Sequence, residues 1–278
     1  MTDTGRGPRT EDFIVVNGGE PTLHPGVMSI FSLLGSTGAY VTLFTNGRTL
    51  ADPGTAEKVI GTGVSRLTVP IYGHDSQVHD ACTQSAGSWT QTIQGLNNVF
   101  SLRISLGRRV HVELKTLVCS RTLNSLAATV QFIRTTFSQC DRYVLSGLIQ
   151  SETARGGGAV VDLSDPRVVS AVEGGVSEAL KMSTFVSLDS IPLCLLTPPV
   201  RSQWLLKRAR QELASPLGGG QFVYFDCEWP EGRVMGDSWQ TCHCPHQGCR
   251  FHPTCRMNDQ YFDEELTKAV KPSYPKPA

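Results

Sequence analysis

The stretch VVNGGEPTLHPGV, at residues 15–27, joins a predicted strand to a predicted helix. The apolar run FIVVN at residues 13–17 predicts the strand, and GVMSIFSLLG at residues 26–35 has the apolar spacing of a helix. Gly18 and Gly19 therefore lie at the carboxyl end of a strand. In barrel enzymes this is where a ligand meets bare backbone.

The next two residues favour a ligand that carries hydrogen-bond donors. Glu20 and the neighbouring carbonyls can accept hydrogen bonds from an ammonium group. Pro21 has a fixed φ angle, which presets the backbone for the turn into the helix. We therefore expect a binding site for a ligand with a donor-rich head.

Short β-branched runs alternate with longer amphipathic segments from Phe13 to about Leu188. This alternation is typical of parallel strands joined by crossover helices, so the fold class is α/β. We predict strands at residues 13–17, 40–44, 66–72, 110–118, 142–149 and 184–188, and the clearest helices at 26–35, 88–102, 123–137 and 165–182.

The balanced charge of the chain does not favour nucleic acid or an anionic membrane as a partner. The chain of 278 residues has 25 basic and 25 acidic residues, so its charge gives no reason to expect nucleic acid or an anionic membrane. We expect a small-molecule or peptide substrate instead. The sequence has no apolar run of the roughly 20 residues that span a bilayer, and the start MTDTGRGPRTED is polar. We therefore expect a cytoplasmic protein.

The order of the motifs resembles the radical S-adenosylmethionine (SAM) superfamily. There, a Gly-Gly-Glu-Pro element after the second strand holds the amino group of SAM, and an Asn-Gly step after the third strand lines the same pocket. The run VPIYGHDSQVHDACTQSAGSWTQTIQGLNNV at residues 69–99 also follows the superfamily's pattern of a strand, a His-Asp pair, a Gly-aromatic pair and a helix. The resemblance implies that the cofactor contacts Gly18, Gly19, Glu20, Pro21, Thr45 and Asn46.

The resemblance also implies a fold and an activity. The fold would be a partial (β/α)6 TIM-like radical SAM barrel with a cysteine-rich C-terminal extension. The full form would take an electron donor and cleave SAM reductively, which starts radical chemistry on a small-molecule or peptide substrate. The fold alone does not name the substrate, because one barrel hosts many chemistries.

Several charged residues are further candidates for the site. Glu113 and Lys115 alternate with apolar neighbours, so both should face the barrel lumen, with Lys115 near the cofactor; an internal ion pair is the alternative. Arg155, in a glycine-rich run, could meet the SAM carboxylate or a substrate anion. For the pair His79 and Asp80, and for nearby His74, we favour a structural role in capping a helix or holding a loop.

One part of the superfamily pattern is missing. Radical SAM enzymes bind a [4Fe-4S] cluster through a Cys-x3-Cys-x2-Cys loop after the first strand, but the first cysteine of this chain is Cys82. Two explanations stay open. The chain is a shortened radical SAM enzyme, which we favour, or it is a cluster-less relative that acts as a binding or partner module.

The C-terminal cysteines predict a metal site. The run TCHCPHQGCRFHPTC at residues 241–255 has short spacings that can bring several thiolates around one centre. It resembles the SPASM and twitch extensions, which hold an auxiliary [4Fe-4S] cluster and begin with an Ile-Pro-x-Cys step. A structural zinc is the alternative, because histidines lie close by. The implied metal ligands are Cys194, Cys242, Cys244, Cys249 and Cys255, with Cys227 as a further candidate.

These observations predict a division of the chain. Residues 1–12 would be a disordered lead, 13–190 the partial barrel, 191–262 the cysteine-rich auxiliary metal-binding region, and 263–278 a helix end with a disordered tail. The remaining cysteines, scattered along the barrel, carry no motif and are predicted to be small apolar core residues. They are Cys82, Cys119 and Cys140.

Overall fold

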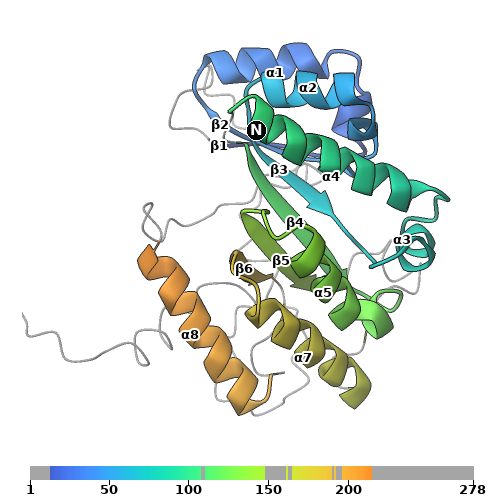
Figure 1. Cartoon of the computed structure of the whole chain (residues 1–278), viewed down its shortest axis with the longest axis vertical. Helices are drawn as coiled ribbons and strands as arrows, with labels where there is room; N and C mark the ends of the chain where they lie inside the picture. Colours follow the sequence, from blue (N-terminus) through green and yellow to red (C-terminus); the bar gives the residue numbers. More distant parts are fainter. Residues whose placement is uncertain are drawn as a thin grey trace, which may run out of the picture.

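The computed structural model describes residues 13–107, 110–147, 161, 165–189, 191 and 196–214. They form one twisted six-stranded sheet in which neighbouring strands follow the chain order and all pairs are parallel (Figure 1). The predicted α/β class is confirmed, and six parallel strands are consistent with a partial (β/α)6 barrel. The strands are β1 (Phe13–Val16), β2 (Tyr40–Phe44), β3 (Val64–Pro70), β4 (His111–Val118), β5 (Arg142–Gly147) and β6 (Phe185–Asp189).

The helices cover one face of the sheet, because parallel crossovers that always step to the next strand are all right-handed and return on the same side (Figure 1). The four helices that the sequence predicts most clearly are present as α1, α4, α5 and α7. The structure also has α2 and α3, in gaps between strands where crossover helices are expected without a fixed range, and α8 after β6. The helices are α1 (Val27–Ser36), α2 (Pro53–Gly61), α3 (Ser76–Thr83), α4 (Ser88–Ser105), α5 (Leu126–Thr136), α7 (Pro166–Leu180) and α8 (Pro198–Ala214), with short 3-10 turns η1 (Pro21–Leu23), η2 (Thr49–Ala51) and η3 (Leu123–Ser125).

Aspartates start three of these helices. Asp52 accepts from the Thr55 amide at 2.8 Å before α2, and Asp75 accepts from the Val78 amide at 2.9 Å before α3. Asp165 caps α7 in the same way. A carboxylate at this position satisfies an amide that the helix cannot pair and favours the positive end of the helix dipole.

The two faces of the sheet differ in polarity because side chains alternate along each strand. The face toward the helices is apolar and fully buried, with Val41, Leu43, Leu67, Val112 and Leu145 among its residues. The opposite face would line the lumen of a barrel, and we call it the lumen face. It is rich in polar groups: Thr42, Arg66, Thr68, Glu113, Lys115, Arg142, Ser146, Ser187 and Asp189.

Residues beyond position 190 contribute to the same core. Ile191 and Leu196 belong to the buried apolar cluster, and Trp204 on α8 is fully buried. α8 packs beside α7 and β6. The described structure therefore uses part of the proline-rich segment that follows β6 to close the end of the helix layer.

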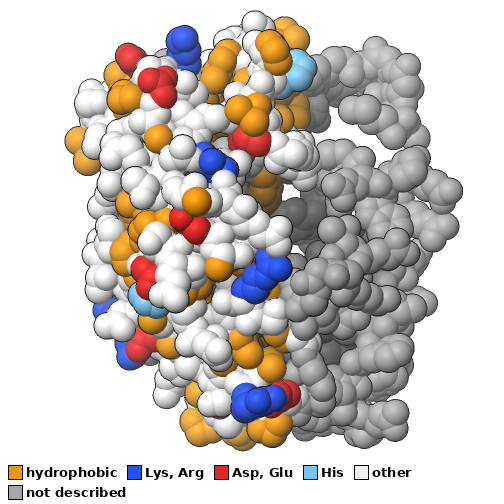
Figure 2. Space-filling model, turned by 90° about the vertical axis from the view of Figure 1, so that its right-hand side faces the viewer, with side chains coloured by type: hydrophobic (Ala, Val, Ile, Leu, Met, Phe, Trp, Pro, Cys, Tyr) orange, Lys and Arg blue, Asp and Glu red, His pale blue; other side chains and the backbone are white. Residues whose placement is uncertain are grey.

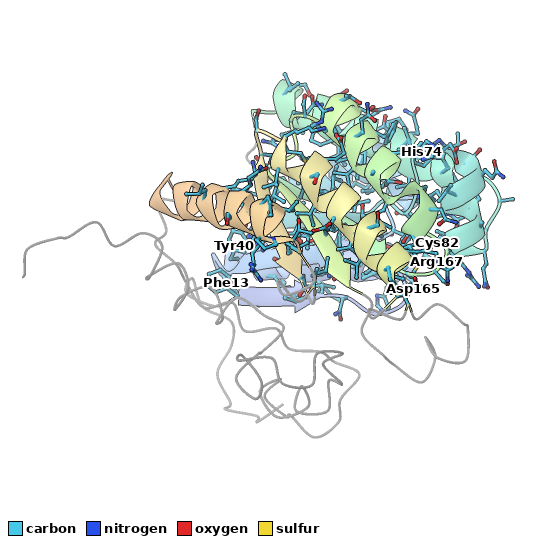
Figure 3. All side chains as sticks on the ribbon, turned by 90° about the horizontal axis from the view of Figure 1, so that it is seen from below. Phe13, Tyr40, His74, Cys82, Asp165 and Arg167 are labelled. Carbon is cyan, nitrogen blue, oxygen red and sulfur yellow. The ribbon has the colours of Figure 1, made fainter. Side chains whose placement is uncertain are left out.

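Surface charge on the described part of the chain is mixed. On the face in Figure 2, acidic and basic side chains are interspersed with apolar ones instead of gathering by sign. Figure 3 shows the two ends of the sheet: Phe13 and Tyr40 lie at the amino ends of β1 and β2, and His74 and Cys82 lie at the opposite end. A search of the described residues finds no helix with the length and apolar character needed to cross a membrane.

The contact between Gly35 and Gly63 gives a stability prediction. A Cβ atom on Gly63 would lie 2.1 Å from the Cα atom of Gly35, so α1 and the start of β3 cannot keep their approach. We expect Gly63→Ala to lower the free energy of unfolding by about 1–3 kcal/mol, as overpacking does, in urea titrations followed by circular dichroism. Gly61→Ala is the matched control, because a Cβ atom there meets nothing within 4 Å. Equal unfolding midpoints for the two variants would contradict the prediction.

Candidate functional site

The glycine loop that follows β1 presents open backbone at the carboxyl edge of the sheet. Gly18 has a φ angle of +98° and Gly19 one of +51°, conformations that residues with a Cβ atom rarely adopt. A Cβ atom at either position would meet no other atom within 4 Å. The glycines are therefore required by the backbone conformation and not by crowding. The loop leaves room for a ligand against its peptide groups.

Glu20 fastens the glycine loop to the loop that follows β2. Its Oε1 atom accepts from the Thr22 hydroxyl at 2.6 Å, the Thr22 amide at 3.1 Å and the Thr45 hydroxyl at 2.8 Å. Its Oε2 atom accepts from the Asn46 amide at 2.7 Å. The structure thus brings Thr45 and Asn46, predicted from the next strand, directly against Glu20.

This arrangement sharpens the role expected for Glu20. A carboxylate offers about four acceptor positions, and four donors of the chain itself already share them. Glu20 is therefore first a latch between two loops. A ligand ammonium would find its acceptors chiefly among the backbone carbonyls of the glycine loop, with the Glu20 charge close by.

A second set of hydrogen bonds holds the β2 loop that receives this latch. The Asn46 side-chain oxygen accepts from the Arg48 amide at 2.9 Å, and the Asn46 carbonyl accepts from the Thr92 hydroxyl at 3.0 Å. The Thr22 and Thr49 hydroxyls are hydrogen-bonded to each other at 2.6 Å. The loops after β1 and β2 therefore form one braced unit. Sequence reasoning missed Thr22 and Thr49, whose partners depend on tertiary contacts.

The His-Asp pair has the structural role that we expected. The Asp80 carboxylate accepts from the Trp89 amide at 2.7 Å, the Ser88 hydroxyl at 2.8 Å and the Gly87 amide at 2.7 Å, and so caps α4. These bonds, the Trp89 amide first, hold the pKa of Asp80 below its usual value. His79 is buried, and its burial lowers its pKa to about 4, so the ring is neutral at pH 7 and accepts from the Tyr72 amide.

Glu113 and Lys115 both lie on the lumen face, as expected, and each pairs with side chains of other strands. The Glu113 carboxylate is 3.4 Å from the Arg142 guanidinium and 3.9 Å from that of Arg66. The Lys115 ammonium donates to Asp189 at 3.2 Å. The alternative of an internal ion pair is thus realised with other partners, which tie β3 to β5 and β4 to β6.

Some predicted site residues lie outside the described residues. Arg155 and all five predicted metal ligands fall there, so their roles stay predictions. Of the three scattered cysteines, Cys119 and Cys140 are buried as predicted, whereas the prediction is wrong for Cys82, which is only partly buried. Cys82 lies on α3 near the rim of the sheet, where solvent reaches its side chain.

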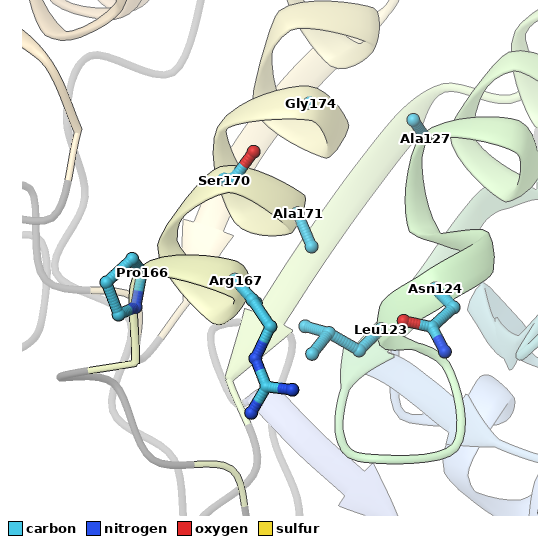
Figure 4. Close-up of a pocket in the computed structure, with 8 residues that line it drawn as sticks. All are labelled: Leu123, Asn124, Ala127, Pro166, Arg167, Ser170, Ala171 and Gly174. Atoms are coloured by element: carbon cyan, nitrogen blue, oxygen red, sulfur yellow. The ribbon is translucent and has the colours of Figure 1, made fainter.

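A groove of about 510 Å³ lies between the first turns of α5 and α7 (Figure 4). It belongs to the outer helix layer and contains none of the residues predicted to bind the cofactor. The exposed guanidinium of Arg167 at its rim is paired with Asp165. Its lining is Leu123, Asn124, Ala127, Pro166, Arg167, Ser170, Ala171 and Gly174.

The latch predicts a specific sensitivity to Glu20→Gln. In the glutamine, an NH2 group replaces one of the two carboxylate oxygens, which now accept from the Thr45 hydroxyl and the Asn46 amide. A donor would then face a donor, and buried or half-buried groups would lose their hydrogen-bond partner. We expect a loss of about 1–3 kcal/mol in the free energy of unfolding, measured by urea titration. Glu57→Gln, on the exposed surface of α2, should leave the unfolding midpoint unchanged. If both variants unfold at the same urea concentration, the latch contributes no stability.

Comparison with known proteins gives one curated relative by sequence. The AdoMet-dependent heme synthase of Methanosarcina barkeri (strain Fusaro / DSM 804) is 31% identical over 127 residues. The match covers 43% of this chain and 36% of the relative, so the chain spans little more than a third of that relative's length. No protein-family model matches the chain.

Solved structures give weaker likenesses. The Streptococcus suis protein SuiB, in a structure with S-adenosylmethionine, is 13% identical with a TM-score of 0.47, over 64% of this chain and 39% of that one. The structure of SuiB with the precursor peptide SuiA is 15% identical with a TM-score of 0.48, and the match covers 64% of this chain and 38% of that one. An archaeal TYW1 is 16% identical with a TM-score of 0.32, and the match covers 44% of this chain and 38% of that one.

The assignment to a family therefore rests on the curated relative and on the motifs. The glycine loop, the Thr45–Asn46 turn and the His-Asp run follow successive parallel strands in the superfamily's order. Together with the sequence relationship to an AdoMet-dependent enzyme, this order makes the chain similar to the radical SAM superfamily.

Proposed function

We propose that this chain binds SAM at the glycine loop of residues 18–21, as part of an enzyme that cleaves SAM reductively to start radical chemistry. The observation that carries the proposal is the open backbone of Gly18 and Gly19, braced through Glu20 to the next loop. When bound and reduced by one electron, SAM supplies an organic radical that abstracts hydrogen from a substrate.

The geometry suits the methionine head of SAM. An ammonium group has three donors and no acceptor, so it needs several oxygens in fixed positions. Peptide carbonyls at the glycine loop can supply them, because a Cβ atom on Gly18 or Gly19 would meet no atom within 4 Å, which leaves space beside the backbone. The Glu20 charge adds an attraction for a cationic ligand. Since the latch fixes the loop before binding, little conformational entropy is lost when the ligand arrives.

The lumen face supports a polar substrate. Arg66, Arg142 and Lys115 lie on it together with Glu113 and Asp189, so both signs of charge are present on the face that would line the lumen. This favours a small organic molecule or a peptide with ionised groups. The similar proteins differ on this point, since one is a heme synthase and another was solved with a precursor peptide. The substrate class therefore stays broad in this proposal, and an electron donor is a required partner.

The C-terminal cysteines would add a second centre. We place an auxiliary [4Fe-4S] cluster at Cys194, Cys242, Cys244, Cys249 and Cys255, by resemblance to SPASM and twitch extensions. The alternative function is a cluster-less SAM-barrel relative that acts as a binding or partner module. In that case a structural zinc would hold the same region, since zinc also takes sets of cysteine and histidine ligands.

Binding of SAM tests the first part of the proposal. We expect the full chain to bind SAM saturably in equilibrium dialysis and Gly19→Ala to weaken binding by at least about tenfold, or about 1.4 kcal/mol. Gly107→Ala is the matched control, because Gly107 has a similar φ angle of +59° and is equally open, but lies at the end of α4. The control should bind SAM within about twofold of the parent chain.

Two outcomes would contradict this proposal. If the parent chain shows no saturable binding of SAM, the proposed function is wrong. If Gly19→Ala and Gly107→Ala weaken binding equally, the effect comes from backbone strain, and the glycine loop is not the site.

Metal analysis separates the two functions. After anaerobic reconstitution, we expect about four irons and four sulfides per chain, lost in a Cys249→Ala, Cys255→Ala double variant. The matching measurement is the ultraviolet–visible spectrum, whose cluster absorption should fall with the iron. About one zinc per chain with no iron would overturn the auxiliary cluster and favour the binding module.

A further inference from the structure

Two cysteines far apart in the sequence meet at the carboxyl edge of the sheet. Cys82 lies in α3, and Cys119 follows the last residue of β4. Their side chains are hydrogen-bonded to each other. Cys119 is 4% exposed, whereas Cys82 is partly exposed, so solvent reaches the pair from the α3 side. Figure 3 marks Cys82 at the end of the molecule opposite Phe13 and Tyr40.

The backbone around Cys119 favours a thiolate. Besides the Cys82 side chain, the amides of Arg121 and Thr122 are hydrogen-bonded to the Cys119 sulfur. The Thr122 hydroxyl lies 3.6 Å from the same sulfur, but its one proton has a better acceptor in the Leu117 carbonyl at 2.6 Å. The Cys82 hydrogen bond and these amides together lower the pKa of Cys119 to about 5, although burial opposes the shift.

The same hydrogen bond keeps Cys82 protonated. Because Cys82 donates its proton to Cys119, its pKa is raised above the usual thiol range, and burial adds to the effect. The pair thus shares one proton, with the charge on Cys119. In this arrangement a thiolate can attack an oxidant, and the neighbouring thiol can then attack the oxidised sulfur to form a disulfide.

Among the described residues, the titratable and charged groups beside the pair are Tyr72 and Arg121. In the segment after β3, burial raises the pKa of Tyr72 to about 12, so its hydroxyl stays neutral. From the turn after β4, the Arg121 guanidinium donates to the Cys82 carbonyl at 3.5 Å, and its charge only partly opposes the rise in the pKa of Cys82. The Gln84 amide, with its oxygen turned toward Arg121, accepts from both terminal nitrogens at 3.0 Å. Arg121 therefore links α3 to the turn that carries Cys119.

We propose that Cys82 and Cys119 are a redox-active dithiol, which a peroxide converts to a disulfide. The Cys119 thiolate attacks one peroxide oxygen, which breaks the O–O bond, forms a sulfenic acid and releases hydroxide. The Cys82 thiol then attacks the Cys119 sulfur, the S–S bond forms, and water leaves with the Cys82 proton. The two sulfurs together lose two electrons, which reduce the peroxide. A small oxidant is required because Cys119 is almost fully buried.

The chain contains a matched control for this chemistry. Cys140 has the same 4% exposure as Cys119, but burial raises its pKa to about 11. Burial alone therefore predicts equal reactivity for the two thiols. A reactive thiolate predicts that Cys119 reacts much faster than Cys140 at neutral pH, because the thiolate is the nucleophile.

The experiment uses the reduced full chain, treated with hydrogen peroxide at pH 7, quenched with N-ethylmaleimide and digested with trypsin. Trypsin places the three thiols on separate peptides: residues 67–103 with Cys82, 116–121 with Cys119 and 135–142 with Cys140. We expect a disulfide between the first two peptides. The Cys119 peptide should react at least about tenfold faster than the Cys140 peptide, as thiolate fraction controls the rate.

Variants separate the two roles. Cys82→Ser should stop at a sulfenic acid on Cys119, trapped by dimedone, whereas Cys119→Ser should slow the oxidation of Cys82 by at least about tenfold. Cys140→Ser should form the same disulfide as the parent chain. Circular dichroism of each variant checks that it is folded, and the peptide yields of the parent chain test the proposal without any substitution.

Three results would overturn the proposal. The first is equal reaction rates for the Cys119 and Cys140 peptides in the folded parent chain. The second is oxidation of Cys82 at the parent rate in Cys119→Ser. The third is a disulfide that joins Cys82 or Cys119 mainly to a C-terminal cysteine. None of these readouts depends on SAM binding, so a failure here is distinguishable from a failure of the proposed function.

Discussion

The Glu20 carboxylate is the interaction on which the candidate site depends. Glycines with positive φ angles have large freedom in the unfolded chain, so a loop that contains two of them needs external bonds to hold one conformation. Glu20 supplies these bonds through Thr45 and Asn46, which belong to the loop of the next strand. One side chain therefore sets both the shape of the glycine loop and its position relative to β2.

The polarity of the lumen face adds a second constraint. Parallel sheets are commonly apolar on both faces, because helices cover both. Here one face is apolar and the other carries Glu113, buried between Arg66 and Arg142. A buried carboxylate is stable only with charged or hydrogen-bonding partners, and these partners come from adjacent strands. The sheet thus keeps charges on the side where a barrel enzyme handles its cofactor and substrate.

The sequence predicts those features that depend on local patterns. β-branched runs predict all six strands to within two residues at each boundary, and the Asp165–Pro166 step is a readable start signal for α7. The sequence could not show that Thr45 donates a hydrogen bond to Glu20. The two residues are far apart along the chain, and the rotamers that bring them together depend on packing. The meeting of Cys82 with Cys119 is equally hidden, since it follows from the adjacency of β3 and β4.

At the carboxyl edge of this sheet, anionic side chains repeatedly accept hydrogen bonds from backbone amides that have no other partner. Where a parallel strand turns into the next segment, backbone amides are left without a partner, and anions can use them. Glu20 takes the Asn46 amide, Asp80 takes those of Gly87 and Trp89, and Cys119 takes those of its own turn. Each anion is stabilised where it lies, so the edge can hold several of them without neutralising cations beside each one. Because SAM carries a sulfonium and an ammonium group, negative charges at this edge would favour the proposed cofactor. The same pattern makes the proposed thiolate compatible with the proposed cofactor site, since both use amides that the fold leaves unpaired.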